Sequence, residues 1–398
     1  MAATPACLVV SPDEVDFRTV RLSCGDERVL RLTNACASPI SVTAASLAGS
    51  AEFRLGSAAF PLSVPAEGVV TLGVAYRPTD IGPDVAALRF SSVEPGGRLV
   101  EVGTTLLGRG ATTSGTVDVF EVPAKADVLF VIDDSGSMAD KQLALQQRMT
   151  ELLAYANDAG VDWQLGVTTT DDDNGAGGAL ARFNGTAILR PTSPNFTATW
   201  NALVNRGISG SPLEMGLGPA VKAVTPPLSL TQNAGFVRQD ASLGLVFLTD
   251  TVDGSPRDPA RYVERLRSVK GARRANELSV SGLLPLLAAS PTGLCTYEAP
   301  EDGRYLQAVS ATGGIAEEIC AAATQGDSYV RLGEAAFGRR ATWFLTAPPA
   351  GAITVTINGA TVPASQWTRS GSVVTFQRSV APRARDVVRF AYDTQCLP

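Results

Sequence analysis

Carboxylate and hydroxyl side chains follow an apolar run in the middle of the chain. Residues 128–132 read Val-Leu-Phe-Val-Ile, and Asp133, Ser135 and Ser137 come directly after them at alternating positions. A continuous run of this kind predicts a buried parallel strand with Asp133 at its carboxyl end, where open α/β sheets bind ligands. A helical pattern begins near Met138. One carboxylate and two hydroxyls before a helix predict a small all-oxygen site for a hard cation such as Mg²⁺.

The Asp-x-Ser-x-Ser pattern at a strand end resembles the metal-ion-dependent adhesion site (MIDAS) of the von Willebrand factor A (vWA) family. That family adds a Thr from a second loop and an Asp at the end of a later strand. Here Ser211, in the run 210–217, stands at the Thr position, and Asp250 ends the run 243–250. Ser keeps the hydroxyl but loses the methyl group that stiffens the Thr rotamer. The resemblance implies a metal-ligand set of Asp133, Ser135, Ser137, Ser211 and Asp250.

Plainer interpretations of these residues remain open. Ser135 and Ser137 are also good helix N-caps, and Asp250 also suits a turn at the end of a strand. Further polar residues near the ligand positions are candidates for supporting or partner-facing roles: Asp134, Ser209, Glu214, Asp171, Asp172 and Asp253. Glu214 either supports the site or is an ordinary acid at a helix start. The acidic loop 171–175 is either a separate Ca²⁺ site or a solvated turn, and it lacks the EF-hand spacing.

Composition narrows the function classes. The chain has 398 residues, of which 45% are hydrophobic and 18% charged, so it is globular and long enough for two or three domains. A net charge of −6 and a pI near 5.0 argue against nucleic-acid binding. The sequence contains no histidine, which removes Ser-His-Asp and Cys-His catalysis and the commonest zinc ligand. We therefore expect a protein that is not an enzyme.

Six cysteines without a Cys-x-x-Cys motif favour disulfides in an oxidising compartment over a zinc or thioredoxin-like site. The alternative is six free buried thiols in a cytosolic protein. We expect the pairs Cys24 with Cys36, Cys295 with Cys320, and Cys7 with Cys396. No run is long and apolar enough to span a bilayer. The N-terminus lacks the apolar core of a signal peptide, so we expect a mature chain from the cell surface, the periplasm or the extracellular space.

Residues 1–112 predict an antiparallel β-sandwich, because short β-rich runs alternate with turn residues. The expected strands are 28–33, 40–43, 69–76, 85–91 and 99–107. Phrases such as 10–17, 30–34, 74–78 and 107–110 resemble the Hydin-type immunoglobulin-like family, also called choice-of-anchor D or ASH. Such domains commonly act as spacers or docking modules. A Thr/Ser/Gly-rich linker is expected over 113–125.

Residues 126–340 predict a doubly wound α/β domain, because strand and helix patterns alternate. The expected strands are 127–132, 164–169, 187–190, 243–249 and 278–284, and the expected helices are 138–157, 213–224, 258–270, 303–312 and 328–337. Residues 341–398 predict a small β-domain with a type I′ hairpin at Asn358–Gly359.

Most of 120–396 resembles bacterial vWA proteins of the type found in myxobacteria. The resemblance implies a divalent-cation-dependent adhesion or protein-binding module, with Mg²⁺, or Mn²⁺ or Ca²⁺, bridging to an Asp or Glu of a protein partner. The alternative is a structural subunit of a surface filament, gliding complex or injection apparatus, in which the metal site is vestigial or stabilising.

Overall fold

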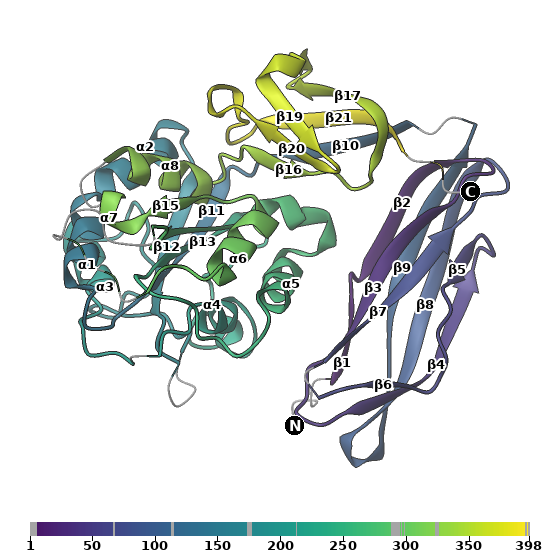
Figure 1. Ribbon diagram of the computed structural model, residues 1–398, viewed down its shortest axis with the longest axis horizontal. Helices are drawn as coiled ribbons and strands as arrows, with labels where there is room; N and C mark the ends of the chain where they lie inside the picture. Colours follow the sequence, from purple (N-terminus) through teal and green to yellow (C-terminus); the bar gives the residue numbers. More distant parts are fainter. Residues whose placement is uncertain are drawn as a thin grey trace. The chain divides into compact units, whose positions relative to one another are not determined.

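The computed structural model describes residues 6–66, 68–112, 115–172, 177–211, 213–287, 295, 297, 299–322, 326–394 and 396. The protein is multidomain and rich in β-sheet (Figure 1). It divides into two compact units. The first comprises Met1–Val119, Leu345–Val355 and Arg389–Pro398, and the second comprises Phe120–Phe344 and Thr356–Val388.

The N-terminal part of the first unit is a β-sandwich, as expected, but it is not wholly antiparallel, because Glu14–Arg21 pairs in parallel with Arg98–Ala111. One sheet has the order β1-β3-β7-β5 and the other the order β2-β9-β8-β4-β6. The strands are β1(Leu8–Ser11), β2(Glu14–Arg21), β3(Asp26–Asn34), β4(Ile40–Gly49), β5(Phe53–Leu55), β6(Leu62–Val64), β7(Val69–Tyr76), β8(Gly82–Glu94) and β9(Arg98–Ala111). All five expected strand segments lie within these strands or overlap them.

Apolar side chains at alternating positions of the strands pack between the two sheets. Along β3, for example, Leu30 and Leu32 are buried while Arg31 is exposed, which is the pattern of a sheet with one face toward the core. The rings of Phe17, Phe53 and Tyr76 pack together in that core, with centroids 4.6–5.6 Å apart. The sandwich therefore has a continuous apolar interior of its own.

The expected linker is wrong for most of its length. Gly115–Glu121 forms strand β10, and β11 already begins at Lys125. The apolar residues Val117 and Val119 of β10 are exposed, whereas Thr116 and Asp118 are buried. Asp118 accepts hydrogen bonds from the amide of Thr346 (2.9 Å) and the hydroxyl of Tyr392 (2.7 Å). The polar and apolar residues of 116–119 do alternate, but the polar ones face inward, which is the reverse of the usual arrangement of a half-buried strand.

The C-terminal strands form two small sheets, with orders β10-β21-β17-β18 and β16-β20-β19. Their bounds are β16(Thr342–Phe344), β17(Pro349–Ile357), β18(Ala360–Thr361), β19(Trp367–Ser370), β20(Val373–Phe376) and β21(Val387–Thr394). The predicted hairpin is confirmed. Asn358 and Gly359 have φ of 52° and 83°, as a type I′ turn requires, and Ile357 pairs with Ala360.

The second unit contains a five-stranded parallel sheet with the order β12-β11-β13-β14-β15. Its strands are β11(Lys125–Ile132), β12(Asp162–Thr169), β13(Ser242–Leu248), β14(Leu278–Leu284) and β15(Ala316–Glu318). Every residue of β13 and β14 is buried, which agrees with the apolar run 243–248 of β13, whereas β14 also buries Ser279 and Ser281.

Helices cover both faces of this sheet. They are α1(Ala139–Gln147), α2(Met149–Asp158), α3(Phe196–Val204), α4(Leu217–Val224), α5(Pro259–Lys270), α6(Arg304–Thr312), α7(Ile319–Ala322) and α8(Gly326–Ala336). Phe130 of β11 packs into one apolar cluster with residues of α1, α2, α3 and α8. Its neighbour Leu129 points to the opposite face and packs with residues of α4, α5 and α6.

Three sequence expectations in this unit need correction. The strand expected at 187–190 is only an isolated bridge between Leu189 and Leu165. The helix expected over 138–157 breaks at Arg148 (φ −98°, ψ 18°) into α1 and α2. The helix expected from 213 begins at Leu217, because the preceding residues form a loop held by contacts described below.

Three disulfides stabilise the fold, and they indicate an oxidising environment. The predicted pair Cys295–Cys320 is confirmed. The other two predicted pairs are wrong, because Cys7 bonds to Cys36 and Cys24 bonds to Cys396. The register of β1 against β3 places Leu8 opposite Asn34, and the amide of Ala35 donates to Cys7 O (2.7 Å), which brings Cys7 beside Cys36.

None of the helices in the described ranges combines the length and the apolar character that a bilayer crossing needs.

Candidate metal centre

The two predicted acidic ligands lie at adjacent strand ends of the parallel sheet. Asp133 follows β11 and Asp250 lies two residues after the end of β13, and β11 and β13 are neighbours. From β11 the chain passes to β12 on one side, and from β13 it passes to β14 on the other. The segments leaving the two strands therefore diverge, which makes this edge the switch point of the sheet, where open α/β folds bind ligands.

Asp133 is fully buried and firmly oriented. Its Oδ1 accepts a hydrogen bond from the Ser135 amide (2.8 Å), and its Oδ2 accepts one from the Thr249 hydroxyl (2.7 Å). Its amide donates to Leu248 O (2.9 Å), which ties the loop after β11 to β13. Each carboxylate oxygen has a second lone pair, so both can still accept another contact.

Ser135 and Ser137 lie together in the loop before α1. Their hydroxyl oxygens are 3.5 Å apart, and Ser135 is buried while Ser137 is half-buried. The N-cap of α1 is Met138, and no side chain caps it by a hydrogen bond. The interpretation of these serines as helix caps therefore does not describe this loop.

Asp250 is as fully buried as Asp133. It is fully buried, and burial raises the pKa of its carboxyl above the usual value, although the Ser137 hydroxyl and the Lys141 ammonium act in the opposite direction. Its Oδ2 has the Lys141 ammonium at 3.1 Å, and for its Oδ1 no hydrogen-bond partner is found within the described part of the chain. A buried carboxylate with unused acceptor capacity fits a place for a cation.

Lys141 is the residue that sequence reasoning missed. Its side chain is only 1% exposed, and its Nζ lies 3.1 Å from Asp250 Oδ2 and donates to Ser137 O (2.8 Å). Nζ also contacts Asp140 Oδ1 at 3.3 Å. Side chains in the first turn of a helix lean toward its N-terminus, so a lysine three residues after Met138 reaches back into the loop. The position of Lys141 in the first turn of the helix could therefore have indicated, from the sequence, that its side chain reaches the Asp133 loop.

The second ligand-bearing loop reaches this edge of the sheet through backbone contacts. Gly210 N donates to Asp134 O (2.8 Å), and Met215 N donates to Thr170 O (3.0 Å) at the end of β12. Ser211 is buried and its hydroxyl accepts from the Leu213 amide (3.1 Å), whereas Ser209 is exposed. Ser211 is thus the better candidate of the two serines.

Gln142 and Glu214 support these loops from inside. Gln142 Nε2 donates to the carbonyls of Asp133 and Gly207, both at 2.9 Å, and its Oε1 accepts from the Arg206 amide. Glu214 is buried and accepts a hydrogen bond from the Thr170 hydroxyl. Glu214 therefore has a supporting position rather than that of a surface helix acid.

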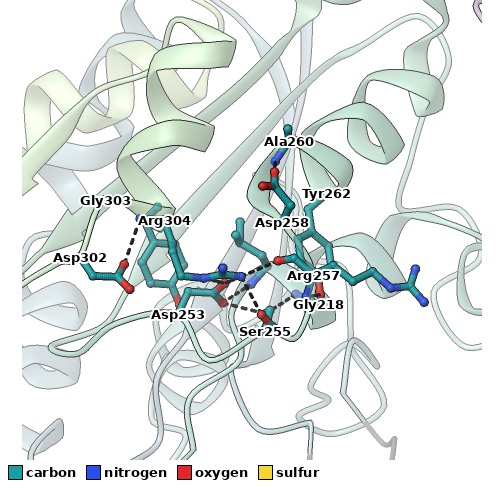
Figure 2. A network of polar contacts seen from close by, with 12 residues as sticks. Gly218, Asp253, Ser255, Arg257, Asp258, Ala260, Tyr262, Asp302, Gly303 and Arg304 are labelled. Carbon is teal, nitrogen blue, oxygen red and sulfur yellow. Dashed lines mark hydrogen bonds and ion pairs between the residues drawn. The ribbon is translucent and has the colours of Figure 1, made fainter. Parts of the chain in front are cut away.

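Asp253 is a structural residue, not a partner-facing one. Figure 2 shows it between α4 and α6 with Arg304 and Ser255. Its side chain is fully buried, Arg304 NH2 lies 3.0 Å from its Oδ2, and its Oδ1 accepts from the Ser255 hydroxyl (2.7 Å) and the Leu217 amide (3.1 Å). Ser255 Oγ accepts from Gly218 N (3.0 Å). These bonds satisfy the first amides of α4, which a helix cannot satisfy itself.

Asp134 is half-buried and points toward the second loop and Asp171. An added Cβ at Gly210 would meet its Oδ1 at 2.4 Å. Burial, followed by the charge of Asp171, raises the pKa of Asp134 to about 6, while Arg206 acts in the opposite direction. Asp171 and Arg206 also line a cavity of about 220 Å³ at the end of β12.

The acidic loop is engaged in part by a salt bridge. Lys222 of α4 lies 2.6 Å from Asp172 Oδ1, so this acid is already neutralised. The remaining residues proposed for a second Ca²⁺ site, 173–175, lie outside the described residues.

The side chains present fit a hard divalent cation, but the Lys141 ammonium already contacts one of them, Asp250. Two buried carboxylates and two neighbouring hydroxyls are oxygen donors of the kind Mg²⁺ prefers. No cluster of three or more His, Cys, Asp or Glu side chains occurs within the described ranges. An Asp/Ser ligand set contains only two carboxylates, so such a cluster is not required.

Comparisons with known proteins give only distant likenesses. No family model and no curated protein matches the chain. Among solved structures, an ASH/PapD-like domain of human CEP192 is 14% identical with a TM-score of 0.23, and the match covers 28% of this chain and 92% of that chain. The E. coli chaperone DraB is 13% identical with a TM-score of 0.21, over 27% of this chain and 56% of that chain.

A longer match is proximal thread matrix protein 1 from the mussel byssus, 13% identical with a TM-score of 0.36. It covers 53% of this chain and about half, 49%, of that chain. At these scores the likenesses carry no argument about function.

Proposed function

We propose that the second unit contains a vWA-like, doubly wound domain that binds a protein partner through a divalent cation at the Asp133 loop. The observation that carries this proposal is the meeting of Asp133 and Asp250, two buried carboxylates, at the switch point of the parallel sheet. Folds of this type bind ligands at that edge. The Asp-x-Ser-x-Ser spacing supplies the matching hydroxyls.

In this proposal, Ser135 and Ser137 hold the ion directly through their hydroxyls. Asp133 and Asp250 hold it directly or through water, and Ser211 contributes from the second loop. A bound Mg²⁺ or Mn²⁺ supplies an electrophilic position that a partner's Asp or Glu fills. Without the ion, the partner carboxylate faces the like charge of Asp133. Gln142 and Glu214 keep the two loops in register.

We place the protein at a bacterial surface or in the envelope. Three disulfides support an oxidising compartment. The N-terminal sandwich then serves as an ASH-type spacer or docking module, and no catalytic role is assigned to the chain.

Metal titration with matched variants tests this proposal. Calorimetry of the full chain with Mn²⁺ or Mg²⁺ is expected to show one site, which disappears in Asp133→Asn. Asp240→Asn is the control, because Asp240 is an exposed acid of the same unit paired with Lys125, near the amino end of β11. Circular dichroism checks that both variants are folded. Equal heats for wild type and Asp133→Asn contradict a metal site at this loop.

A second candidate function has its own supporting observation. The Lys141 ammonium already neutralises Asp250. A site with an internal cation favours a structural subunit whose assembly is independent of metal. Assembly or partner capture that is unaffected by EDTA and by Asp133→Asn supports this candidate.

A further inference from the structure

Lys141 is one of four lysines in the chain, and it lies where a cation is expected to bind. Its side chain is 1% exposed and Asp250 is fully buried, so the two charges form a desolvated pair. Asp250 has no other cation within ion-pair distance among the described residues. The buried carboxylate of Asp250 therefore has two candidate partners, the Lys141 ammonium and a divalent metal ion.

Direct binding of both cations to Asp250 is electrostatically unfavourable in this arrangement. Mg²⁺ binds carboxylate oxygen at about 2.1 Å. Lys141 Nζ is 3.1 Å from the same carboxylate, and it also donates to the carbonyl of Ser137, whose hydroxyl is a proposed ligand. An ion bound between these groups therefore lies within about 5 Å of the ammonium, at a distance where like charges in a buried site repel strongly.

Lys141 has an alternative partner on the solvent side. Asp140 precedes it on α1, its side chain is 51% exposed, and its Oδ1 is 3.3 Å from Nζ. A long, flexible lysine stem allows Nζ to move outward while it keeps an acidic partner. The Lys141–Asp250 contact therefore opposes binding of the ion, and Asp140 is the acid that can pair with the ammonium after it moves.

We propose that Lys141 is a tethered cation that competes with the divalent ion for Asp250 and must withdraw before the ion binds. This inference rests on the proposed function. In the metal-free protein, the Lys141 ammonium neutralises Asp250. The affinity for the metal ion then depends on the exchange of this ammonium for the ion. Binding to a partner is then switched by metal concentration rather than held permanently on.

Amine labelling of the wild-type full chain reads this exchange directly. The four lysines are acetylated at one fixed pH and quantified by peptide mass spectrometry, with EDTA or with saturating Mn²⁺. Lys125 and Lys222, whose side chains are 40% and 42% exposed, should react quickly in both states. Lys270 is 5% exposed and donates to Arg238 O, so it should react slowly in both. Lys141 should change from slow to fast, by severalfold or more, when Mn²⁺ is added.

Calorimetry of Lys141→Met provides the second arm, with Lys125→Met as the matched control. Removing the ammonium should strengthen Mn²⁺ binding by about tenfold or more, because nothing then competes for Asp250. Lys125→Met should bind like the wild type. If Lys141→Met does not fold, the labelling experiment on the wild type decides the question.

The outcomes separate this inference from the proposed function. If the wild type binds Mn²⁺ while Lys141 stays slow to label and Lys141→Met binds no more tightly, the competition is refuted and the metal site stands. If only Lys141→Met binds Mn²⁺, the competition is supported and the metal-dependent function of the natural chain is refuted. If neither protein binds Mn²⁺, both ideas are refuted.

Discussion

At the scale of single residues, the buried pair of Lys141 and Asp250 has a measurable energetic signature. Breaking a buried ion pair by removing one partner leaves an uncompensated charge, which costs about 3–5 kcal/mol. In EDTA, Asp250→Asn and Lys141→Met should each lower the free energy of unfolding by about that amount in urea titrations.

The double variant Lys141→Met/Asp250→Leu tests whether the stability losses of the two single variants both come from breaking the Lys141–Asp250 ion pair. Neither charge is then left alone, so the double variant should lose much less stability than the sum of the single variants. Additive losses would show that the two side chains do not form the pair.

Asp134 predicts a specific pH dependence in the absence of divalent cations. Its folded pKa is about 6, against 3.8 for the unperturbed group. The folded protein holds this proton up to about pH 6, whereas the unfolded chain loses it near 3.8, so the contribution of Asp134 to the free energy of unfolding falls as pH rises between these values. Relative to wild type, Asp134→Asn should gain about 1–2 kcal/mol between pH 4 and 7, after allowance for solvent screening.

The control for this prediction is the same pair of proteins at pH 4, where both folded proteins carry a neutral side chain at position 134. Their difference in unfolding free energy at pH 4 is the reference for the gain at pH 7. A difference that does not change between pH 4 and pH 7 would contradict the raised pKa.

The proposed ligands could be identified from the sequence because their types and spacing follow strand ends. The role of Lys141 was not predicted, because a lysine on an amphipathic helix is normally expected to be exposed to solvent. Only its place in the first turn of α1, leaning back toward Ser137, gives it access to Asp250. Asp253 was ambiguous for a similar reason, because its partner Arg304 is 51 residues away in the chain.

At the scale of elements, the Asp253–Arg304 contact joins α4, α6 and the second ligand loop. Gly254 N donates to Glu214 O (2.6 Å), so the 253–255 segment also holds the loop that follows Ser211. Asp253→Ala should lower stability by about 2–4 kcal/mol, because it leaves Arg304 and the Leu217 amide without this partner. It should also weaken Mn²⁺ binding. A destabilised variant with wild-type Mn²⁺ affinity would separate this contact from the metal centre.

Packing of α8 against α2 depends on a glycine. A Cβ at Gly333 would come within 2.0 Å of Leu152 O, which is backbone and cannot yield cheaply. Gly333→Ala should therefore cost about 1–3 kcal/mol or more. Gly351→Ala is the control, since a Cβ there meets nothing within 4 Å. Equal stability of the two variants would contradict the close approach of the helices.

Elements with strong apolar patterns were predictable, and those with weak patterns were not. The buried strands β11, β13 and β14 agree with the sequence to within about two residues at each end. β10 was missed because its short alternating run follows the Thr/Ser/Gly-rich residues 112–115 and was assigned with them to a linker. β15 has three residues, all half-buried, so it is too short to show a period.

At the scale of the whole molecule, two disulfide pairs were predicted wrongly because pairing depends on strand register. Cys24 and Cys36 are near each other in sequence, yet β1 places Cys7 beside Cys36. Non-reducing peptide mapping should recover Cys7–Cys36, Cys24–Cys396 and Cys295–Cys320. A peptide containing Cys24 linked to Cys36 would contradict this arrangement.

The measurement that tests the central claim most directly is anomalous diffraction from crystals of the full chain soaked in Mn²⁺. We predict one strong peak between Asp133, Ser135, Ser137 and Asp250, with Lys141 Nζ moved away from Asp250 toward Asp140. An Asp133 loop without a peak, and with Lys141 still in contact with Asp250 at saturating Mn²⁺, would contradict a divalent-cation site in this protein.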